Sequence, residues 1–315
     1  MDLNGIFPPI PTPFTSDDAI DFRALSSNVK RWGRAGLRGM LVLGSNGEGP
    51  FVDADESARV LAAVRKDLPD DQVILAGTGH QSTRQTIVAT QAAAAAGADV
   101  ALVLTPFYFK SQMSAEALFR HYTELADHSP IPVMIYNMPP VTGVAVPVAT
   151  VVKLAAHPQI IGVKDSSGDV AYVADLVAHT RHIQKGDDPF QVLVGVAPNL
   201  FAALTVGAHG GIVAVANVFP ELCVMLYRYV RAGRHADALE LQRALTPLAR
   251  AVTATYGVSG LKAALDAVGE YVGGAPRLPL LPVGAGPAQE IKQMVEKLQT
   301  LASATPSSHL NPQTA

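Results

Sequence analysis

The sequence predicts an α/β protein, a (β/α)8 or TIM barrel with a C-terminal helical extension. Eight short apolar runs rich in β-branched residues recur along the 315 residues, and segments with helical periodicity separate them. Most runs are continuous rather than alternating, which is typical of parallel strands buried on both faces. No glycine-rich phosphate-binding motif follows any run, so a doubly wound nucleotide-binding sheet is less favoured.

The elements follow one another in βα order. We expect strands at residues 6–10, 39–43, 73–76, 99–104, 132–136, 160–163, 191–194 and 211–215. Helices are expected at 21–35, 55–65, 82–96, 114–128, 147–155 and 198–206. Capping residues precede several of these helices, and glycines follow others, as helix ends require.

More helix follows the eighth strand than one barrel needs. Helical segments are predicted at 220–232, 235–256, 259–268 and 287–302. We therefore expect a barrel over residues 1–220 and a helical region over 221–302 that packs on it. The polar last stretch, 303–315, contains two prolines and is expected to be a disordered tail.

Composition excludes several classes of function. The net charge of −3 offers no electrostatic footprint for a nucleic-acid backbone or an anionic membrane surface. The single cysteine, Cys223, cannot form an internal disulfide or a cysteine-based zinc site. No signal peptide or membrane span is recognisable, so a soluble, cytoplasmic protein is expected.

The carboxyl ends of the strands are the place to look for a site, because barrel enzymes build their active sites there. Lys164 directly follows the sixth run. Desolvation at a barrel mouth favours a neutral amine, which can attack a carbonyl and form a Schiff base. The alternative is a solvated lysine, or one paired with a carboxylate such as Asp165.

Three further side chains stand at strand ends. Tyr136 closes the fifth run, next to the sixth in a barrel, where its hydroxyl could carry protons or simply sit at the wet rim. Ser45 lies in a glycine-flanked turn whose backbone N–H groups could hold a carboxylate, although turn serines are common. Tyr108 belongs to an aromatic run that could equally be an interface patch.

Four motifs carry a resemblance. They are Gly-Ser-Asn-Gly-Glu at 44–48, Tyr-Asn-Met-Pro at 136–139 with Thr-Gly at 142–143, Gly-Val-Lys-Asp-Ser-Ser-Gly-Asp at 162–169, and Pro-Pro-Ile-Pro-Thr-Pro-Phe at 8–14. Together they resemble the dihydrodipicolinate synthase and N-acetylneuraminate lyase family of class I pyruvate aldolases, from about Gly5 to about Val268. Within that family the chain looks most like 4-hydroxy-2-oxoglutarate aldolases, which share the first motif and a run similar to 129–133.

The resemblance implies catalytic roles. Lys164 would be the Schiff-base lysine, and Tyr136 the proton carrier beside it. Ser45 would relay protons between Tyr136 and a second tyrosine, Tyr108, which in the family reaches in from the neighbouring subunit of a homotetramer. A homotetramer is therefore expected.

The resemblance also implies substrate contacts. Ser45 and Asn46 would hold the pyruvate carboxylate through backbone N–H groups, and Ser166 would contact the distal part of the substrate. Gly195 and Ile212 fall at positions that line the family's pocket. The expected partners are small 2-keto acid and aldehyde substrates.

The reaction implied is reversible cleavage of 4-hydroxy-2-oxoglutarate to pyruvate and glyoxylate. The alternatives are dihydrodipicolinate synthesis from pyruvate and aspartate semialdehyde, and cleavage or dehydration of a 2-keto-3-deoxy sugar acid. A more remote alternative is a non-catalytic barrel that binds 2-keto acids. Val141 stands where dihydrodipicolinate synthases usually carry an arginine that binds aspartate semialdehyde, and this departure argues against the first alternative.

Neither a cofactor nor a metal is expected. Class II aldolases use a metal in place of the imine, and such a site needs histidines and carboxylates that converge. His179 and His182 form an H-x-x-H pattern on a probable helix, which we interpret as a solvated helix face.

Overall fold

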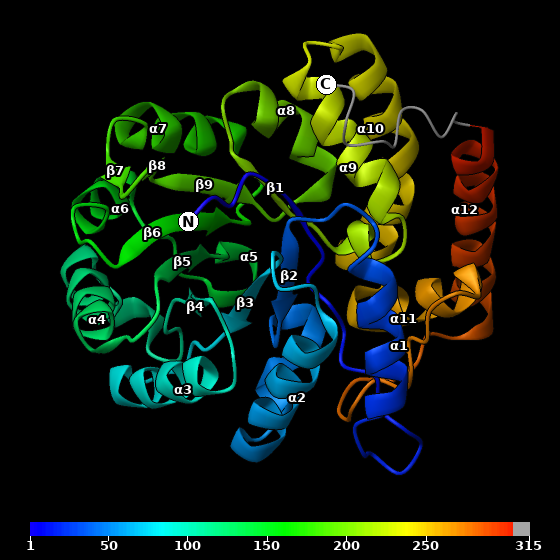
Figure 1. Cartoon of the computed structure of the whole chain (residues 1–315), viewed down its shortest axis with the longest axis horizontal. Helices are drawn as coiled ribbons and strands as arrows, with labels where there is room; N and C mark the ends of the chain where they lie inside the picture. Colours follow the sequence, from blue (N-terminus) through cyan, green and yellow to red (C-terminus); the bar gives the residue numbers. More distant parts are fainter. Residues whose placement is uncertain (305–315) are drawn as a thin grey trace.

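The computed structural model describes residues 1–304 and contains a barrel of eight parallel strands (Figure 1). The strands are β1 (Gly5–Phe7), β2 (Gly39–Val42), β3 (Val73–Gly77), β4 (Val100–Leu104), β5 (Val133–Asn137), β6 (Ile160–Asp165), β9 (Gln191–Val194) and β10 (Gly210–Ile212). They pair in the order β1-β10-β9-β6-β5-β4-β3-β2. The predicted fold class is confirmed, and each of the eight strands overlaps one of the predicted apolar runs.

Prolines shorten the first strand. Pro8 and Pro9 follow β1 and have no N–H to donate, so the regular ladder ends at Phe7 rather than at residue 10. The barrel still closes there. The Leu41 N–H donates to the Pro8 carbonyl at 2.9 Å, and the Ile10 N–H donates to the Leu41 carbonyl at 2.9 Å.

The barrel interior is filled with side chains rather than open. Alternate residues of the strands point inward and form one buried apolar cluster, which includes Phe7, Leu41, Leu75, Leu102, Met134, Leu193 and Ile212. Tyr136 lies in the same cluster, at the end of β5. A solid interior leaves only the strand ends and their loops for a binding site.

Seven helices pack around the barrel (Figure 1). They are α1 (Phe22–Trp32), α2 (Ala54–Asp67), α3 (Thr83–Ala95), α4 (Ala115–His128), α6 (Val148–Leu154), α7 (Val170–Thr180) and α8 (Leu200–Thr205). α7 adds a helix to the six that were predicted between the strands. A short hairpin, β7 (Gln184–Lys185) and β8 (Asp188–Pro189), follows α7 and was not predicted.

Short helical turns occupy several strand-end loops. They are η1 (Ser45–Gly47), η2 (Gly49–Phe51), η3 (Lys110–Gln112), α5 (Pro139–Thr142), η4 (Ala197–Asn199) and η5 (Ala214–Asn217). The last of these begins within the predicted eighth strand, which stops at Ile212 rather than at residue 215.

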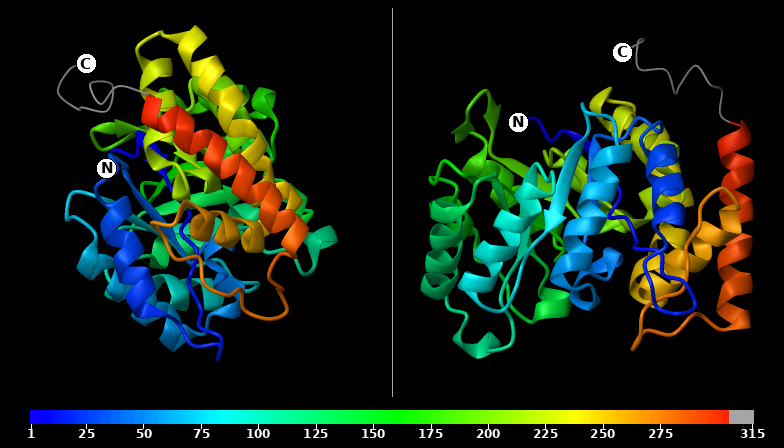
Figure 2. Two further views of the ribbon diagram at one scale, coloured as in Figure 1. Left: turned by 90° about the vertical axis from the view of Figure 1, so that its right-hand side faces the viewer. Right: turned by 60° about the horizontal axis from the view of Figure 1, so that its bottom comes forward.

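In the described chain, up to residue 304, four helices follow the barrel: α9 (Pro220–Arg231), α10 (His235–Arg250), α11 (Gly257–Val268) and α12 (Ala285–Ala304). A π-helical segment, η6 (Ala251–Thr255), interrupts the predicted helix 235–256. α12 lies outermost, against α11 and α10 (Figures 1 and 2). The division at residue 220 stays a prediction about folding units.

The predicted tail began too early. Residues 303 and 304 belong to α12, and the Ser303 side-chain hydroxyl donates to the Gln299 carbonyl, one turn earlier in the helix, at 2.9 Å. The rest of the predicted tail, 305–315, lies outside the described residues.

Candidate active site

Lys164 and Tyr136 lie side by side at the carboxyl ends of β6 and β5. The two residues are partners in the parallel register of these strands. The Lys164 Nζ atom lies 4.1 Å from the centroid of the Tyr136 ring. Both side chains are buried, with 4% and 5% of their surface exposed. Strand pairing therefore brings together the two residues that the sequence singled out first.

Asp165 does not neutralise Lys164. Its carboxylate turns instead to Asn137, whose Nδ2 donates at 2.7 Å, and to the Ser167 hydroxyl, which donates at 2.7 Å. Burial raises the pKa of the Asp165 carboxyl above its ordinary value, although the bonds from Ser167 and Asn137 oppose this shift. Within residues 1–304, no carboxylate lies within ion-pair distance of Lys164. The interpretation of Lys164 as half of a lysine–aspartate pair is therefore wrong.

Gly195 and Ser166 surround the Lys164 stem. Gly195 follows β9, and its N–H donates to the Asp165 carbonyl at 2.7 Å. A Cβ atom at Gly195 would lie 1.9 Å from Ser166 Oγ and 2.9 Å from Lys164 Cε. Only glycine leaves room here for both side chains. Ile212 lies in the apolar interior that also contains Tyr136.

Ser45 and Asn46 form the turn η1 after β2. In the described part of the chain, their backbone N–H groups donate no hydrogen bond to other protein groups. Two residues with left-handed backbones, Leu43 (φ 58°) and Glu48 (φ 55°), bracket this turn. Ser45 is exposed, so the turn presents free donors to whatever enters the site.

A cavity of about 570 Å³ connects the turn with the tyrosine. Ser45, Gly44 and Tyr136 all line it, and its wall continues along the ends of β3 and β4 onto α2 and α3. Its size is in the range of small-molecule sites. The site residues of β2 and β5 thus share one solvent-accessible space.

The three hydroxyls of the expected proton relay are not joined within one chain. The Tyr136 hydroxyl donates to the Met138 sulfur at 2.7 Å. Tyr108 is 77% exposed and stacks edge-on against Phe109, with ring centroids 5.0 Å apart. Among residues 1–304 no hydrogen bond links Tyr136, Ser45 and Tyr108. The relay therefore stays a prediction.

The turn is backed by a buried ion pair that the sequence does not predict. Glu48 Oε1 lies 2.5 Å from Lys262 Nζ, and both side chains are almost fully buried. Burial lowers the pKa of Lys262, although Glu48 opposes this shift. The one available signal was a lysine inside the apolar segment 259–268. Nothing in the local sequence identifies its distant partner.

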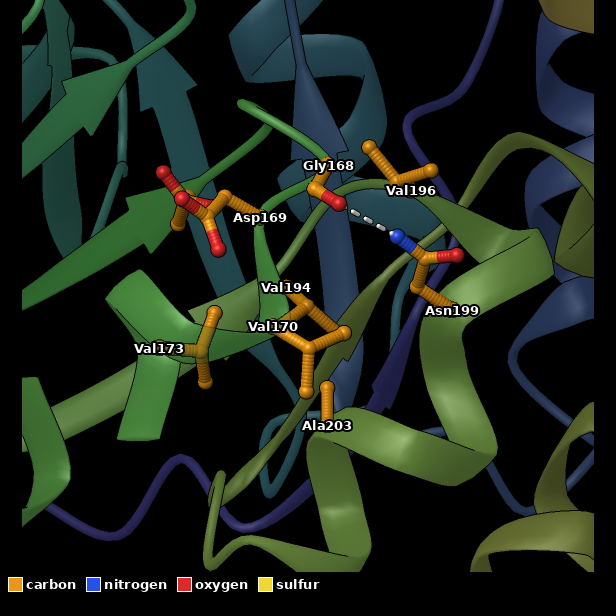
Figure 3. A pocket seen from close by; sticks show the side chains of 9 residues that line it. Gly168, Asp169, Val170, Val173, Val194, Val196, Asn199 and Ala203 are labelled. Atoms are coloured by element: carbon orange, nitrogen blue, oxygen red, sulfur yellow. Dashed lines mark hydrogen bonds between the residues drawn. The ribbon is translucent and has the colours of Figure 1, made fainter. Parts of the chain in front are cut away.

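A second cavity beside Asp165 is too small for a substrate. Its volume is about 10 Å³, at most the space of one water molecule, and valines form much of its wall (Figure 3). Asn199 Nδ2 donates to the Gly168 carbonyl at 2.8 Å across its edge (Figure 3). This contact ties the loop after β6 to the loop after β9.

The histidine pattern does not form a metal site in the described chain. His179 lies on α7 and His182 beyond its end, and both are exposed, as expected of a solvated face. No group of three potential ligands converges among residues 1–304. Of the helices in that same span, none combines the length and the apolar character that crossing a bilayer demands.

Comparison with known proteins identifies the family of this chain. Residues 2–298 match the Dihydrodipicolinate synthetase family. A 4-hydroxy-tetrahydrodipicolinate synthase of Exiguobacterium sp. is 35% identical over 94% of this chain and 98% of its own length. The enzyme of the same name from Methanoculleus marisnigri is 33% identical, over 93% of this chain and 98% of its own length.

Solved structures of enzymes with these names have the same fold as this chain. The 4-hydroxy-tetrahydrodipicolinate synthase of Methylacidiphilum fumariolicum superposes with a TM-score of 0.89 at 28% identity, covering 98% of this chain and 99% of that one. The dihydrodipicolinate synthase of Acinetobacter baumannii, solved with pyruvate, has a TM-score of 0.87 at 28% identity over 94% and 99% of the two chains. The chain therefore belongs to the dihydrodipicolinate synthetase family and is a lyase of its pyruvate-dependent aldolase type.

Proposed function

We propose that this lyase forms a Schiff base between Lys164 and pyruvate. The observation that carries the proposal is the Lys164–Tyr136 pair, in which a buried amine lies against a tyrosine ring, has no carboxylate partner among the described residues and stands at the strand ends of a barrel. Pyruvate is supported as the 2-oxo acid by two structural neighbours that were solved with it.

The chemistry begins with attack of the neutral Lys164 amine on C2 of pyruvate. Loss of the carbonyl oxygen as water gives an iminium ion, and a proton leaves C3 to give an enamine. The enamine then forms a C–C bond to the carbonyl carbon of an aldehyde, and hydrolysis or cyclisation frees Lys164. Tyr136, whose ring centroid lies 4.1 Å from the amine, would carry the protons of water loss and water addition.

The other predicted residues take supporting roles. The free N–H groups of Ser45 and Asn46 would bind the pyruvate carboxylate, and Ser166 would contact the distal part of the substrate. Tyr108, exposed in one chain, would complete the relay from a neighbouring subunit of a homotetramer.

Two aldehydes compete for the second half of the reaction. The names of the relatives that are 33–35% identical support aspartate semialdehyde, and hence 4-hydroxy-tetrahydrodipicolinate synthesis. Val141 counts against aspartate semialdehyde, because an apolar side chain that is 60% exposed cannot bind the carboxylate of that aldehyde as an arginine would. Glyoxylate, and hence 4-hydroxy-2-oxoglutarate cleavage, is therefore kept as the second candidate. Because the relatives are named for the synthesis that uses it, aspartate semialdehyde is the first candidate.

Borohydride trapping tests the Schiff base. Reduction in the presence of pyruvate should attach the three-carbon acid to Lys164, detected by peptide mass, and Lys164→Ala should lose both adduct and turnover. Lys153→Ala, on the outer helix α6, is the matched control and should keep both. A trapped adduct in Lys164→Ala would contradict the proposal, and turnover with each aldehyde would then rank the two candidates.

A further inference from the structure

The buried pair Glu48–Lys262 occupies an unusual place. Glu48 ends the turn that carries Ser45 and Asn46, whereas Lys262 belongs to α11, beyond the barrel. Taking two charges out of water costs free energy that only good geometry and further hydrogen bonds can offset. A contribution to stability alone therefore does not explain a buried ion pair at this position.

The Lys262 side chain contacts residues from three separate segments of the chain. Besides the Glu48 carboxylate, its Nζ donates to the Thr12 carbonyl at 2.8 Å and to the Ala275 carbonyl at 2.6 Å. Thr12 in turn donates from its hydroxyl to the Gly47 carbonyl at 2.7 Å. The ammonium thus reaches the turn twice, through Glu48 and through Thr12.

Glu48 is held from a second side. Its Oε2 accepts the Arg277 backbone N–H at 2.8 Å, while Oε1 meets Lys262 as a close ion pair without a well-aligned hydrogen bond. The Arg277 guanidinium is itself fixed by Glu56, with two contacts of 2.7 Å and 2.8 Å. Lys262 and Arg277, both in the C-terminal region, therefore hold the turn in place through the buried Glu48 carboxylate.

The backbone conformation of Glu48 indicates that the glutamate side chain has a role at this position. Glu48 has φ 55° and ψ 32°, a left-handed conformation that glycine adopts freely and glutamate only at a cost. Such strain persists where the surroundings over-determine it. A glycine would serve the turn alone, so the glutamate is explained by what its carboxylate binds.

We propose that Glu48 and Lys262 are positioning residues, which hold the Ser45–Asn46 turn so that its free N–H groups bind the carboxylate of the 2-oxo acid. The inference rests on the proposed function, because it assigns these N–H groups to pyruvate. Neither side chain touches the reacting atoms. Loss of the pair should therefore weaken binding of pyruvate and leave imine formation at saturation intact.

The experiment uses Glu48→Gln, Lys262→Met and the double variant, with Arg65→Met as the matched control. Arg65 is also partly buried and bonded to backbone carbonyls, at Leu68 and Pro69, away from the turn. For each variant, the pyruvate concentration that gives half-maximal borohydride adduct, the adduct at saturation and the melting temperature are measured. Thr12→Val, which removes only the hydroxyl bond to Gly47, provides a milder perturbation should Lys262→Met fail to fold.

We expect each single variant of the pair to raise the half-saturating pyruvate concentration at least about tenfold, with the saturating adduct unchanged. The double variant should lose less than the product of the two single effects, since it leaves no unpaired charge. Thr12→Val should shift the same concentration in the same direction, and Arg65→Met should lower only the melting temperature. Unchanged half-saturation in folded Glu48→Gln and Thr12→Val would overturn the inference, whereas no adduct in the unaltered protein would overturn the proposed function instead.

Discussion

Lys164 Nζ lies 4.1 Å above the ring of Tyr136, its register partner on the neighbouring strand. The ring face carries partial negative charge and stabilises a cation, so the same contact suits both the ammonium and the iminium ion that would replace it. The hydroxyl, at the far edge of that ring, is the part that can move protons. These two contributions of Tyr136 are separable by mutation.

Tyr136→Phe keeps the ring and removes the hydroxyl. We expect turnover to fall about 10²–10⁴-fold, the usual contribution of a positioned acid or base, while the borohydride adduct still forms slowly at Lys164. Steady-state rates and adduct time courses measure the two effects. Tyr122→Phe, which removes a buried hydroxyl bonded to the Val103 carbonyl at 2.9 Å, should lower stability and leave turnover near normal. Equal rates for Tyr136→Phe and the unaltered protein would refute the proton-carrier role.

Gly195→Ala tests the crowding around the lysine stem. The new methyl group would lie 1.9 Å from Ser166 Oγ and 2.9 Å from Lys164 Cε, so one of these side chains must move. Displacing the nucleophile by about 1 Å should cost about a hundredfold in turnover. Gly286→Ala is the control, because a methyl group there meets no atom of the described residues within 4 Å. Full activity in Gly195→Ala would show that the lysine tolerates displacement.

The strand ends could be predicted from the sequence because each depends on a local pattern. Continuous apolar runs mark the strands, and closure of the barrel makes consecutive strands neighbours, so the sequence predicts Tyr136 and Lys164 side by side, and the strand register pairs them. The roles of Gly195 and Ser166, by contrast, are predicted only by the family resemblance. Local patterns therefore sufficed for residues whose positions the barrel itself dictates.

The features that the sequence does not predict include contacts between segments far apart in the chain. Glu48 and Lys262 meet only because α11 packs against the turn, and neither residue's neighbours indicate that contact. The hairpin β7–β8 has strands of two residues, too short for any periodicity. In α7, valines stand at a helical spacing, but their β-branched side chains favour strand locally.

Lys110 is predicted to supply the charge that Val141 lacks. Its Nζ would lie 3.8 Å from a Cβ on Gly143, two residues after Val141, and within the described chain no carboxylate pairs with it. Lys110→Met should raise KM for a carboxylate-bearing aldehyde by up to about fivefold, more at low salt, and leave KM for pyruvate unchanged. Lys292→Met, on the outer helix α12, should change neither value. Parallel increases in both KM values would instead indicate a general effect on the site.

His121 is predicted to make the fold sensitive to acid. It is buried on α4, with Nδ1 2.9 Å from Thr83 Oγ1, and its Nε2 has no hydrogen-bond partner within residues 1–304. Burial lowers its pKa from 6.5 to about 4. Between these values the unfolded chain binds a proton that the folded chain excludes, so stability should fall as the pH drops from 6.5 towards 4, by about 3 kcal/mol in total.

The variant His121→Asn should remove this contribution to the pH dependence, because asparagine can still bond Thr83 but does not titrate. Urea unfolding at pH 7.5 and pH 5 measures the difference. His128→Asn, at an exposed position on the same helix, should retain the full dependence of the unaltered protein. If His121→Asn and the unaltered protein lost equal stability between the two pH values, the acid sensitivity would have to come from other groups, such as the buried carboxylates.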